Sequence, residues 1–195
     1  MSTISADAYV HVTALVEDGA QIGAGSRVWH QAQVRTRAKI GARCILGKGV
    51  FVDFDVVIGD DSKIQNYACV YHGVSLGRGV FVGPHAVFTN DLRPRATDPN
   101  FAPLGDGDWE VGETTVGDGA AVGANATVLP GIRIGHWAMI GAGAVVTHDV
   151  PPYSLVAGSP ARHLAWVCPC GARLASDATN CARCGDLPAD HPLAN

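Results

Sequence analysis

The sequence predicts an all-β fold, a parallel β-helix in which short strands wind around a closed prism. Three observations predict it: an apolar residue recurs every six positions, a small residue often stands two positions before it, and glycine often follows it directly. A period of six fits neither the 3.6-residue turn of an α-helix nor the two-residue alternation of an isolated strand. It fits a coil of three flat faces, in which each face takes six residues and each coil takes 18.

The apolar residue returns without a miss in two runs. The first run has fourteen positions in steps of six: Val10, Val16, Ile22, Val28, Val34, Ile40, Leu46, Val52, Ile58, Ile64, Val70, Leu76, Val82 and Phe88. The second has six: Val116, Val122, Val128, Ile134, Ile140 and Val146. Twenty such positions exclude chance and predict between six and seven coils. With strands about 4.8 Å apart, the stack is roughly 30 Å tall.

The small residues and the glycines have separate expected roles. Residues such as Ala20, Ser26 and Cys44 share the interior of the prism with the large apolar residues. Glycine follows about half of the apolar positions, as in Ile22-Gly23 and Ile58-Gly59. We expect glycine, or another residue that tolerates turns, to permit the bend at each corner.

The repeat fails once, between Phe88 and Val116. These residues are 28 positions apart, so 22 residues exceed the period, and the segment is rich in proline, glycine and aspartate. The sequence therefore predicts a loop, residues 89–112, that leaves the prism. Long loops in compact domains are often functional. Because a smooth prism has no pocket of its own, we expect the loop to help form the functional site.

Composition excludes several classes of protein. Only 16% of the residues are charged, the net charge is −4, and Lys and Arg form no cluster, which argues against nucleic-acid binding. No apolar run approaches the roughly 20 residues that a membrane span needs. The first ten residues lack the features of a signal peptide. We expect a cytoplasmic protein that binds neither nucleic acid nor membranes.

Four of the six cysteines lie near the C-terminus: Cys168, Cys170, Cys181 and Cys184. Each pair is followed by glycine, which is typical of knuckles that wrap a pair of thiolates around zinc. Without a secretion signal, such a cluster favours metal over disulfides. We expect residues 168–195 to form a small zinc ribbon that is structural and not catalytic. Two disulfides or reduced free thiols are the alternatives.

The second run resembles the hexapeptide-repeat acyltransferases. The resemblance rests on residues 123–128 (GANATV), 140–146 (IGAGAVV) and 149–151 (DVP), and on the exit sequence 156–162 (VAGSPAR). It implies a left-handed parallel β-helix over residues 1–150, a homotrimer, and coenzyme A in the groove between neighbouring prisms. It also implies that a segment at 151–167 contacts the coenzyme. The residues expected to bind it are Gly123, Ala124, Gly141, Ala142, Ser159, Pro160 and Arg162, the last through a phosphate.

The first run narrows the resemblance. Residues 27–30 (RVWH), 63–66 (KIQN), 70–71 (VY), 80–84 (VFVGP), 87–90 (VFTN) and 94–95 (PR) look like those of the nucleotide-linked amino-sugar N-acetyltransferases. The subgroup that they most resemble acetylates the 3-amino group of a UDP-linked 2-acetamido-3-amino-2,3-dideoxyglucuronate. The implied reaction takes acetyl-CoA and serves surface polysaccharide or glycan synthesis. A dTDP-linked sugar or a 4-amino acceptor is the alternative.

The reaction that this resemblance implies is attack of a sugar amine on a thioester, through a tetrahedral oxyanion. By resemblance, Asn90 lies at the mouth of the loop and orients the amine or donates to the oxyanion. His85 is the candidate general base, and His72 and His30 are weaker candidates. The expected sugar-binding residues are Gln65, Asn66, Tyr71, Asp91, Arg93 and Arg95, the arginines through a diphosphate or a carboxylate. Each of these side chains has a purely structural alternative as a corner, turn or solvated residue.

Two other classes share the prism. A γ-class carbonic anhydrase needs a pair of histidines five residues apart and a third one coil away, and no two histidines here are five apart. A non-catalytic assembly module would need neither the loop nor the Gly-Ser-Pro-Ala exit at residues 158–161.

Overall fold

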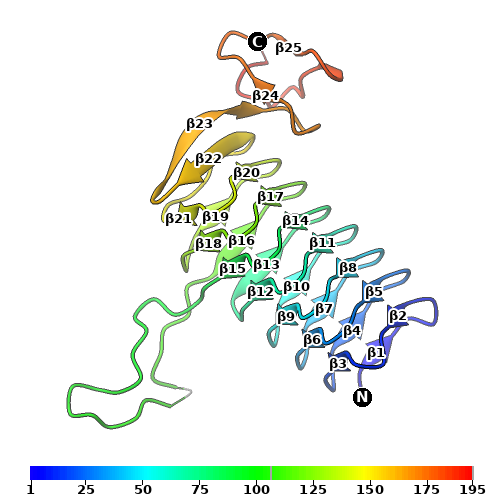
Figure 1. Ribbon diagram of the computed structural model, residues 1–195, viewed down its shortest axis with the longest axis vertical. Coiled ribbons are helices and arrows are strands. Elements are labelled where there is room, and N and C mark those ends of the chain that lie inside the picture. Colours follow the sequence, from blue (N-terminus) through cyan, green and yellow to red (C-terminus); the bar gives the residue numbers. More distant parts are fainter. Residues whose placement is uncertain (106, 195) are drawn as a thin grey trace.

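The computed structural model describes residues 1–105 and 107–194, and it shows a parallel β-helix followed by a small tail (Figure 1). The described residues contain 26 short strands and no helix. Three sheets form the three faces of a prism, so the predicted all-β class and the β-helix are confirmed. The left hand stays a prediction. No helix among the described residues is long and apolar enough to cross a membrane.

Successive strands go to the three faces in turn. The first face contains β1 (Thr3–Ile4), β4 (Gln21–Ile22), β7 (Lys39–Ile40), β10 (Val57–Ile58), β13 (Val74–Leu76), β16 (Thr114–Val116) and β19 (Arg133–Ile134). The second face contains β2 (Tyr9–Val10), β5 (Arg27–Val28), β8 (Ile45–Leu46), β11 (Lys63–Ile64), β14 (Phe81–Val82), β17 (Ala121–Val122), β20 (Met139–Ile140), β22 (Ser154–Gly158), β23 (Ala161–Val167) and β24 (Arg173–Leu174). The third face contains β3 (Leu15–Val16), β6 (Gln33–Val34), β9 (Phe51–Val52), β12 (Cys69–Val70), β15 (Val87–Phe88), β18 (Thr127–Val128) and β21 (Val145–Val146).

Three edges run the length of the prism where these faces meet. The first edge joins the first and second faces, at residues such as 59–62 and 135–138. The second edge joins the second and third faces, at 65–68, 83–86, 123–126 and 141–144. The third edge joins the third and first faces, at 53–56, 71–74 and 129–132.

The coils stack in an 18-residue register that buries the repeated residues. Lys39 pairs with Val57, and Ile40 with Ile58, in parallel strands. The large apolar residues from Ile22 to Val146 and the small ones two positions before them form one continuous core. The six-residue period therefore reports the interior of the prism directly, because every sixth side chain points into it.

The corners bend at a residue that the sequence did not single out. The third residue after most of the interior residues takes a positive φ, for example Gly25 at 67°, Arg43 at 56° and Tyr67 at 59°. A left-handed backbone costs an ordinary L-residue roughly 1–2 kcal/mol. The chain accepts this conformation at many corners because the hydrogen bonds of the neighbouring coils fix the path of the backbone.

The glycines directly after the interior residues have a different role, so the expectation that they permit the bend was wrong. Neither Gly23 nor Gly59, which both lie within the described residues, has a positive φ. A Cβ on Gly23 would lie 2.5 Å from the carbonyl carbon of Gly41 in the next coil, and one on Gly59 would lie 2.6 Å from that of Gly77. These glycines are needed because the stacked backbones approach too closely for a side chain.

The interruption lies between β15 and β16, at the third edge. Figure 1 shows residues 89–105 and 107–113 projecting away from the prism (green). The coil closes as if this segment were absent, since β13 pairs with β16 through Val74 and Thr114. The base of the loop is fastened by a bridge between Asp91 and Val111. The predicted extruded loop is confirmed, and residue 106 within it lies outside the described residues.

The C-terminal tail, described over residues 168–194, lies at the end of the stack opposite the N-terminus (Figure 1). It begins where β23 ends, and β24 pairs antiparallel with β23. Its other strands are β25 (Asn180–Cys181) and β26 (Gly185–Asp186), which pair with each other.

We expect Gly59→Ala to destabilise the protein because its new methyl group meets the backbone of the next coil. Overpacking of this kind costs about 1–3 kcal/mol, and thermal unfolding followed by circular dichroism would measure it as a lower Tm. Gly79→Asn is the matched control: Gly79 has a φ of +67° with open space around it, and asparagine tolerates that conformation. Equal losses in the two variants would contradict close approach as the reason for glycine at position 59.

Candidate functional site

A pocket lies at the base of the extruded loop, on the side of the third face. Its volume is about 390 Å³, and it is lined by Tyr71, Thr89, Asn90, Asp91, Leu92, Pro94, Leu129 and Pro130. Three of the predicted sugar-site residues, Tyr71, Asn90 and Asp91, therefore meet here. Burial raises the pKa of the Tyr71 hydroxyl.

Asn90 is held in place by the coil before it. Its Nδ2 donates to the carbonyl oxygen of His72 at 3.0 Å, and its own carbonyl accepts from the N–H of Gly112 at 2.8 Å. The Oδ1 and the second N–H of the amide are left for a ligand. His72 thus supports Asn90 through its backbone, while its ring stacks on Phe54 with centroids 4.1 Å apart.

Beneath this contact lies Asp53, a buried carboxylate that the sequence reading missed. Asp53 is 6% exposed, and its Oδ1 accepts from Arg35 at 2.8 Å. Its Oδ2 accepts from the N–H of His72 at 3.2 Å. This buried carboxylate, paired with a guanidinium, holds the turn at His72 whose carbonyl accepts from Asn90. The sequence contains a signal for this contact. One coil takes 18 residues, so Asp53 lies one coil after Arg35 and one coil before Tyr71 at the same position of the coil.

The loop arginines are not part of the pocket lining. Arg93 forms an ion pair with Glu110 across the loop, with Nη2 and Oε2 3.3 Å apart. Arg95 donates to the carbonyl of Pro94, and its side chain is exposed. The carboxylate of Asp91 accepts from the N–H of Arg93 at 2.8 Å, as in a turn. Of these three residues, only Asp91 also lines the cavity.

The other predicted residues gather on the second edge. Gln65, Asn66 and His85 lie in two successive corners, and the N–H of His85 donates to the carbonyl of Asn66 at 3.0 Å. The corners of the next two coils hold Gly123 with Ala124, and Gly141 with Ala142. Gln65 and Asn66 are thus separated from Tyr71 and Asn90, although all four were expected at the sugar. His30 lies on the same edge, near the N-terminus, and stacks on His11.

The second edge carries a backbone amide of a kind that some other corners close with a side chain. At other corners, a polar side chain one coil further on accepts from the amide: Asp60 from Ala42 at 2.8 Å, and Asn66 from Lys48 at 2.9 Å. The residue in this position for Ala124 is Ala142, which has no side-chain acceptor. The N–H of Ala124 is therefore left for a ligand that carries carbonyl groups.

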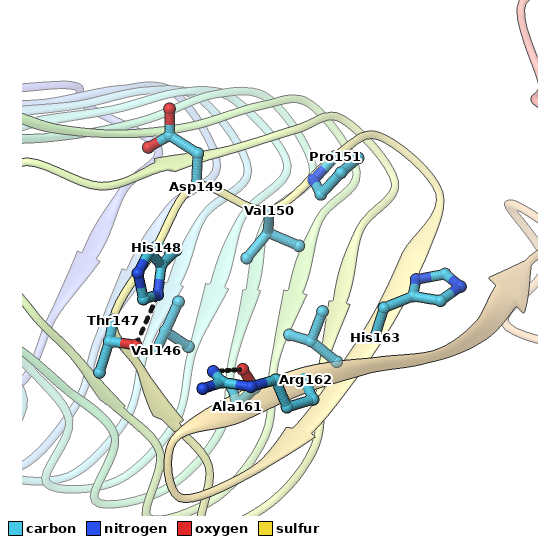
Figure 2. A pocket seen from close by; sticks show the side chains of 10 residues that line it. Val146, Thr147, His148, Asp149, Val150, Pro151, Ala161, Arg162 and His163 are labelled. Carbon is cyan, nitrogen blue, oxygen red and sulfur yellow. Dashed lines mark hydrogen bonds between the residues drawn. The ribbon is translucent and has the colours of Figure 1, made fainter.

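A hairpin of β22 and β23 continues the second edge across the end of the prism. A Cβ on Gly141 would lie 2.7 Å from that of Ala157, so the hairpin follows directly after the Gly141 corner. Ser159 and Pro160 form its tip, joined by a cis peptide bond. Figure 2 shows Arg162 and His163 on one side of a cavity of about 360 Å³, with Thr147 and His148 on the other. The guanidinium of Arg162 forms no ion pair within the described residues.

The two groups of residues lie at opposite sides of the third face. His85 on the second edge and Asn90 on the third edge are five residues apart along β15, or roughly 16 Å in an extended strand. One chain therefore presents an open amide edge and a loop-base pocket that do not meet within the same prism.

The four C-terminal cysteines converge. Their sulfur atoms all lie within 4.8 Å of one another, and Gly171 and Gly185, which follow the two pairs, have φ values of 83° and 94°. Cys181 accepts backbone hydrogen bonds, first from Arg183, which lower the pKa of its thiol to about 6, whereas the neighbouring thiols raise that of Cys184. A divalent cation would let all four ionise. Among the described residues this is the one cluster of such ligands, so the geometry fits a tetrahedral thiolate site.

Comparison with known proteins agrees with this geometry. The bacterial transferase hexapeptide family, with six repeats, matches residues 55–90 and 113–148, and the hexapeptide repeat of succinyl-transferase matches residues 37–66. A dTDP-3-amino-3,6-dideoxy-alpha-D-galactopyranose 3-N-acetyltransferase from Aneurinibacillus thermoaerophilus is 49% identical over 63 residues, which are 32% of this chain and 33% of that protein. A serine acetyltransferase from Mycobacterium tuberculosis is 32% identical over 130 residues, 66% of this chain and 45% of that protein.

Among solved structures, a mutant GDP-perosamine N-acetyltransferase from Caulobacter crescentus in complex with CoA and GDP-perosamine is similar, with a TM-score of 0.54 and 25% identity. The similarity covers 80% of this chain and 56% of that one. This chain thus spans only about a third to just over half of the length of these relatives.

The matched repeats lie on both sides of the extruded loop, and the structure shows the same repeat as stacked coils. The matched repeats are thus the coils of this β-helix, and the chain is similar to the hexapeptide-repeat acyltransferases.

Proposed function

We propose that this protein transfers an acetyl group from coenzyme A to the amino group of a nucleotide-linked amino sugar. The observation that carries this proposal is the loop-base pocket, where Tyr71, Asn90 and Asp91 offer a hydroxyl, an amide and a carboxylate to one ligand. The N-acetyltransferases for a dTDP-linked 3-amino sugar and for GDP-perosamine support it by similarity. The sequence favours a UDP-linked 3-amino sugar, and these relatives make the dTDP- and GDP-linked sugars the alternatives.

The second edge suits the extended arm of the coenzyme. The pantetheine arm contains amides, and the open N–H of Ala124 is a donor for one of their carbonyl groups. The small residues Gly123, Gly141 and Ala142 leave room for the arm beside the backbone. Ser159 and Pro160 lie further along the same line, and Arg162 offers a bidentate donor to a phosphate of the coenzyme.

In the proposed reaction, the sugar amine attacks the thioester carbon and the tetrahedral intermediate collapses to an amide and the thiolate of coenzyme A. The free N–H of the Asn90 amide is available to the oxyanion, or its Oδ1 to the attacking amine. The carboxylate of Asp91 suits the amine or a sugar hydroxyl. His85 lies on the second edge one coil before Ala124, where it could take the proton that the amine loses.

We further propose a homotrimer, because a trimer would bring the two halves of the site together. The outward side chains of the third face are all uncharged: Leu15, Gln33, Phe51, Cys69, Val87, Thr127 and Val145. The other two faces carry lysine and arginine at these positions, such as Lys39 and Lys63. If three copies turn their third faces toward a threefold axis, each third edge meets the second edge of the neighbouring copy. The loop-base pocket would then lie beside the open amide edge.

We also propose that Cys168, Cys170, Cys181 and Cys184 bind one structural zinc ion. The closest pair of sulfur atoms, on Cys168 and Cys184, lies 3.2 Å apart, longer than a disulfide bond. Four thiolates leave zinc no open position, so the ion would stabilise the tail and take no part in acetyl transfer.

Release of the coenzyme A thiol should be observed when acetyl-CoA is mixed with one member of a panel of UDP-, dTDP- and GDP-linked amino sugars. We expect Asn90→Ala to reduce kcat by roughly 10²–10³ if its amide stabilises the oxyanion, without a change in oligomeric state. Arg95→Ala is the control. It changes an exposed residue of the same loop and therefore measures how much a loop substitution alone lowers kcat. An absence of thiol release with every amine would overturn acetyl transfer, and an unchanged rate would remove Asn90 from the site.

Ala142→Asn should weaken coenzyme binding while preserving the fold. The new amide oxygen would accept from the N–H of Ala124, as Asn66 does from Lys48, so the donor proposed for the coenzyme would be occupied. Titration calorimetry with coenzyme A should show at least a tenfold weaker Kd, a loss of about 1.4 kcal/mol, with an equal or higher Tm. Ala24→Asn, at the corresponding corner position of the first edge, is the control. Unchanged binding by the Ala142 variant would place the coenzyme elsewhere.

Val87→Glu should dissociate the trimer because it would bury a carboxylate in the contact between copies. Val57→Glu makes the same change on the first face, where it should have no effect. Sedimentation equilibrium would give about three times the chain mass of 20.2 kDa for the unaltered protein and for the control. A monomeric unaltered protein, or a trimeric Val87 variant, would contradict the proposed contact.

A further inference from the structure

The C-terminal tail contacts the β-helix at the first edge, away from both proposed substrates. The hydroxyl of Tyr153 donates to Oδ1 of Asp190 at 2.8 Å, and Nε2 of His136 donates to Oδ2 of the same carboxylate at 2.9 Å. Tyr153 is 2% exposed, and this burial raises its pKa to about 12. One carboxylate of the tail therefore satisfies a buried hydroxyl of the last coil.

Val167, the last residue of β23, is held from both sides. Its N–H donates to the carbonyl of Tyr153 at 2.8 Å, and its own carbonyl accepts from Nε2 of His191 at 3.2 Å. His191 is 2% exposed, and its ring lies 4.6 Å from that of Tyr153. The chain then passes directly from Val167 to Cys168, so the end of the hairpin is shared between the last coil and the tail.

The tail has too little apolar surface to fold by burial alone. Within its described residues, the fully buried core consists of Cys168, Leu174 and Cys181. Chains shorter than about 40 residues usually need disulfides or a metal to fold. All its cysteines are free, so metal binding is the source of stability that the tail has beside its contacts with the β-helix, and in such small units the free energy of metal binding contributes directly to the free energy of folding.

We propose that the metal-bound tail is a clamp that holds the β22–β23 hairpin in its coenzyme-binding position. This inference rests on the proposed function, because the tip of that hairpin carries Ser159, Pro160 and Arg162. Without the metal, the tail unfolds and removes Asp190 and His191 from their partners. Val167 then loses one hydrogen bond and the packing of His191 against Tyr153, and the antiparallel pairing of β23 with β22 opens toward Arg162. Coenzyme affinity thus depends on an ion that never touches the coenzyme.

Two variants separate the ion from the contact that it supports. Replacing Cys181 and Cys184 together with serine removes two ligands, whereas Asp190→Ala removes the contact with Tyr153 and His136 and leaves the four cysteines intact. Cys44→Ser is the control, because Cys44 is a buried corner residue of the first edge and serines occupy the same position one coil before and one coil after it, at Ser26 and Ser62. The measurements are zinc content by mass spectrometry, hydrogen–deuterium exchange of the amides in residues 161–167, and titration with coenzyme A.

We expect about one zinc ion per chain in the unaltered protein, in Cys44→Ser and in Asp190→Ala, and none in the double serine variant. In both Asp190→Ala and the double variant, exchange at residues 161–167 should be roughly tenfold faster and the Kd for coenzyme A roughly tenfold higher, within the range of coupling between two sites. Far-ultraviolet circular dichroism should show that the β-helix is retained.

The clamp is overturned if the zinc-free variant keeps the exchange rates of the unaltered protein at residues 161–167, or if the unaltered protein contains no zinc. It is also overturned if the zinc-free variant binds coenzyme A as tightly as the unaltered protein. If the unaltered protein binds no coenzyme A, the proposed function fails, and the exchange rates alone still decide whether the tail holds the hairpin.

Discussion

The stacking of one 18-residue coil on the next is the constraint on which the rest of this structure depends. Each coil hydrogen-bonds to its neighbour, as the N–H of Gly41 does to the carbonyl of Ile58 at 2.8 Å. The backbones come so close at the corners that Gly23 and Gly59 have no room for a Cβ. Because every coil must follow the path of the one before it, residues as different as Arg43, Tyr67 and Trp137 adopt the same left-handed conformation.

The same constraint arranges side chains in columns along the three edges, where a column is the set of residues at one position in successive coils. The candidate binding groups lie where the residue type in a column changes. Asn66 accepts from the amide of the preceding corner, whereas Ala142, in the corresponding position three coils later, leaves that donor open. In another column, Arg35 pairs with the buried carboxylate of Asp53, which supports the turn of His72. The loop leaves the prism at Asn90, one coil after His72. A regular scaffold of this kind gains a binding site where its repeat is altered.

Position along the columns also explains why one chain contains two half-sites. Residues 65, 66 and 85 lie on the second edge, and residues 71 and 90 lie on the third. A rigid face separates these edges, so no rearrangement of a single prism brings them together. The uncharged outer surface of that face supports contact between copies as the means of completing the site. The tail adds another connection, since Asp190 and His191 join the last coil to the end of β23.

The sequence by itself determined the prism, its interior and its interruption, because a six-residue period is a direct record of which side chains point inward. It also identified the four cysteines as one cluster, because they lie close together along the chain. The six-residue period does not distinguish one edge from another, so it does not show that Gln65 and Asn66 lie on a different edge from Tyr71 and Asn90. Counting in coils of 18 residues would have shown this. Only the tertiary structure decided which glycines serve close approach, how Asp53 is paired, and where the tail docks. Those features depend on distances between backbones and on contacts such as that of Tyr153 with Asp190. The repeat gives no information about such a contact, because Asp190 lies outside it.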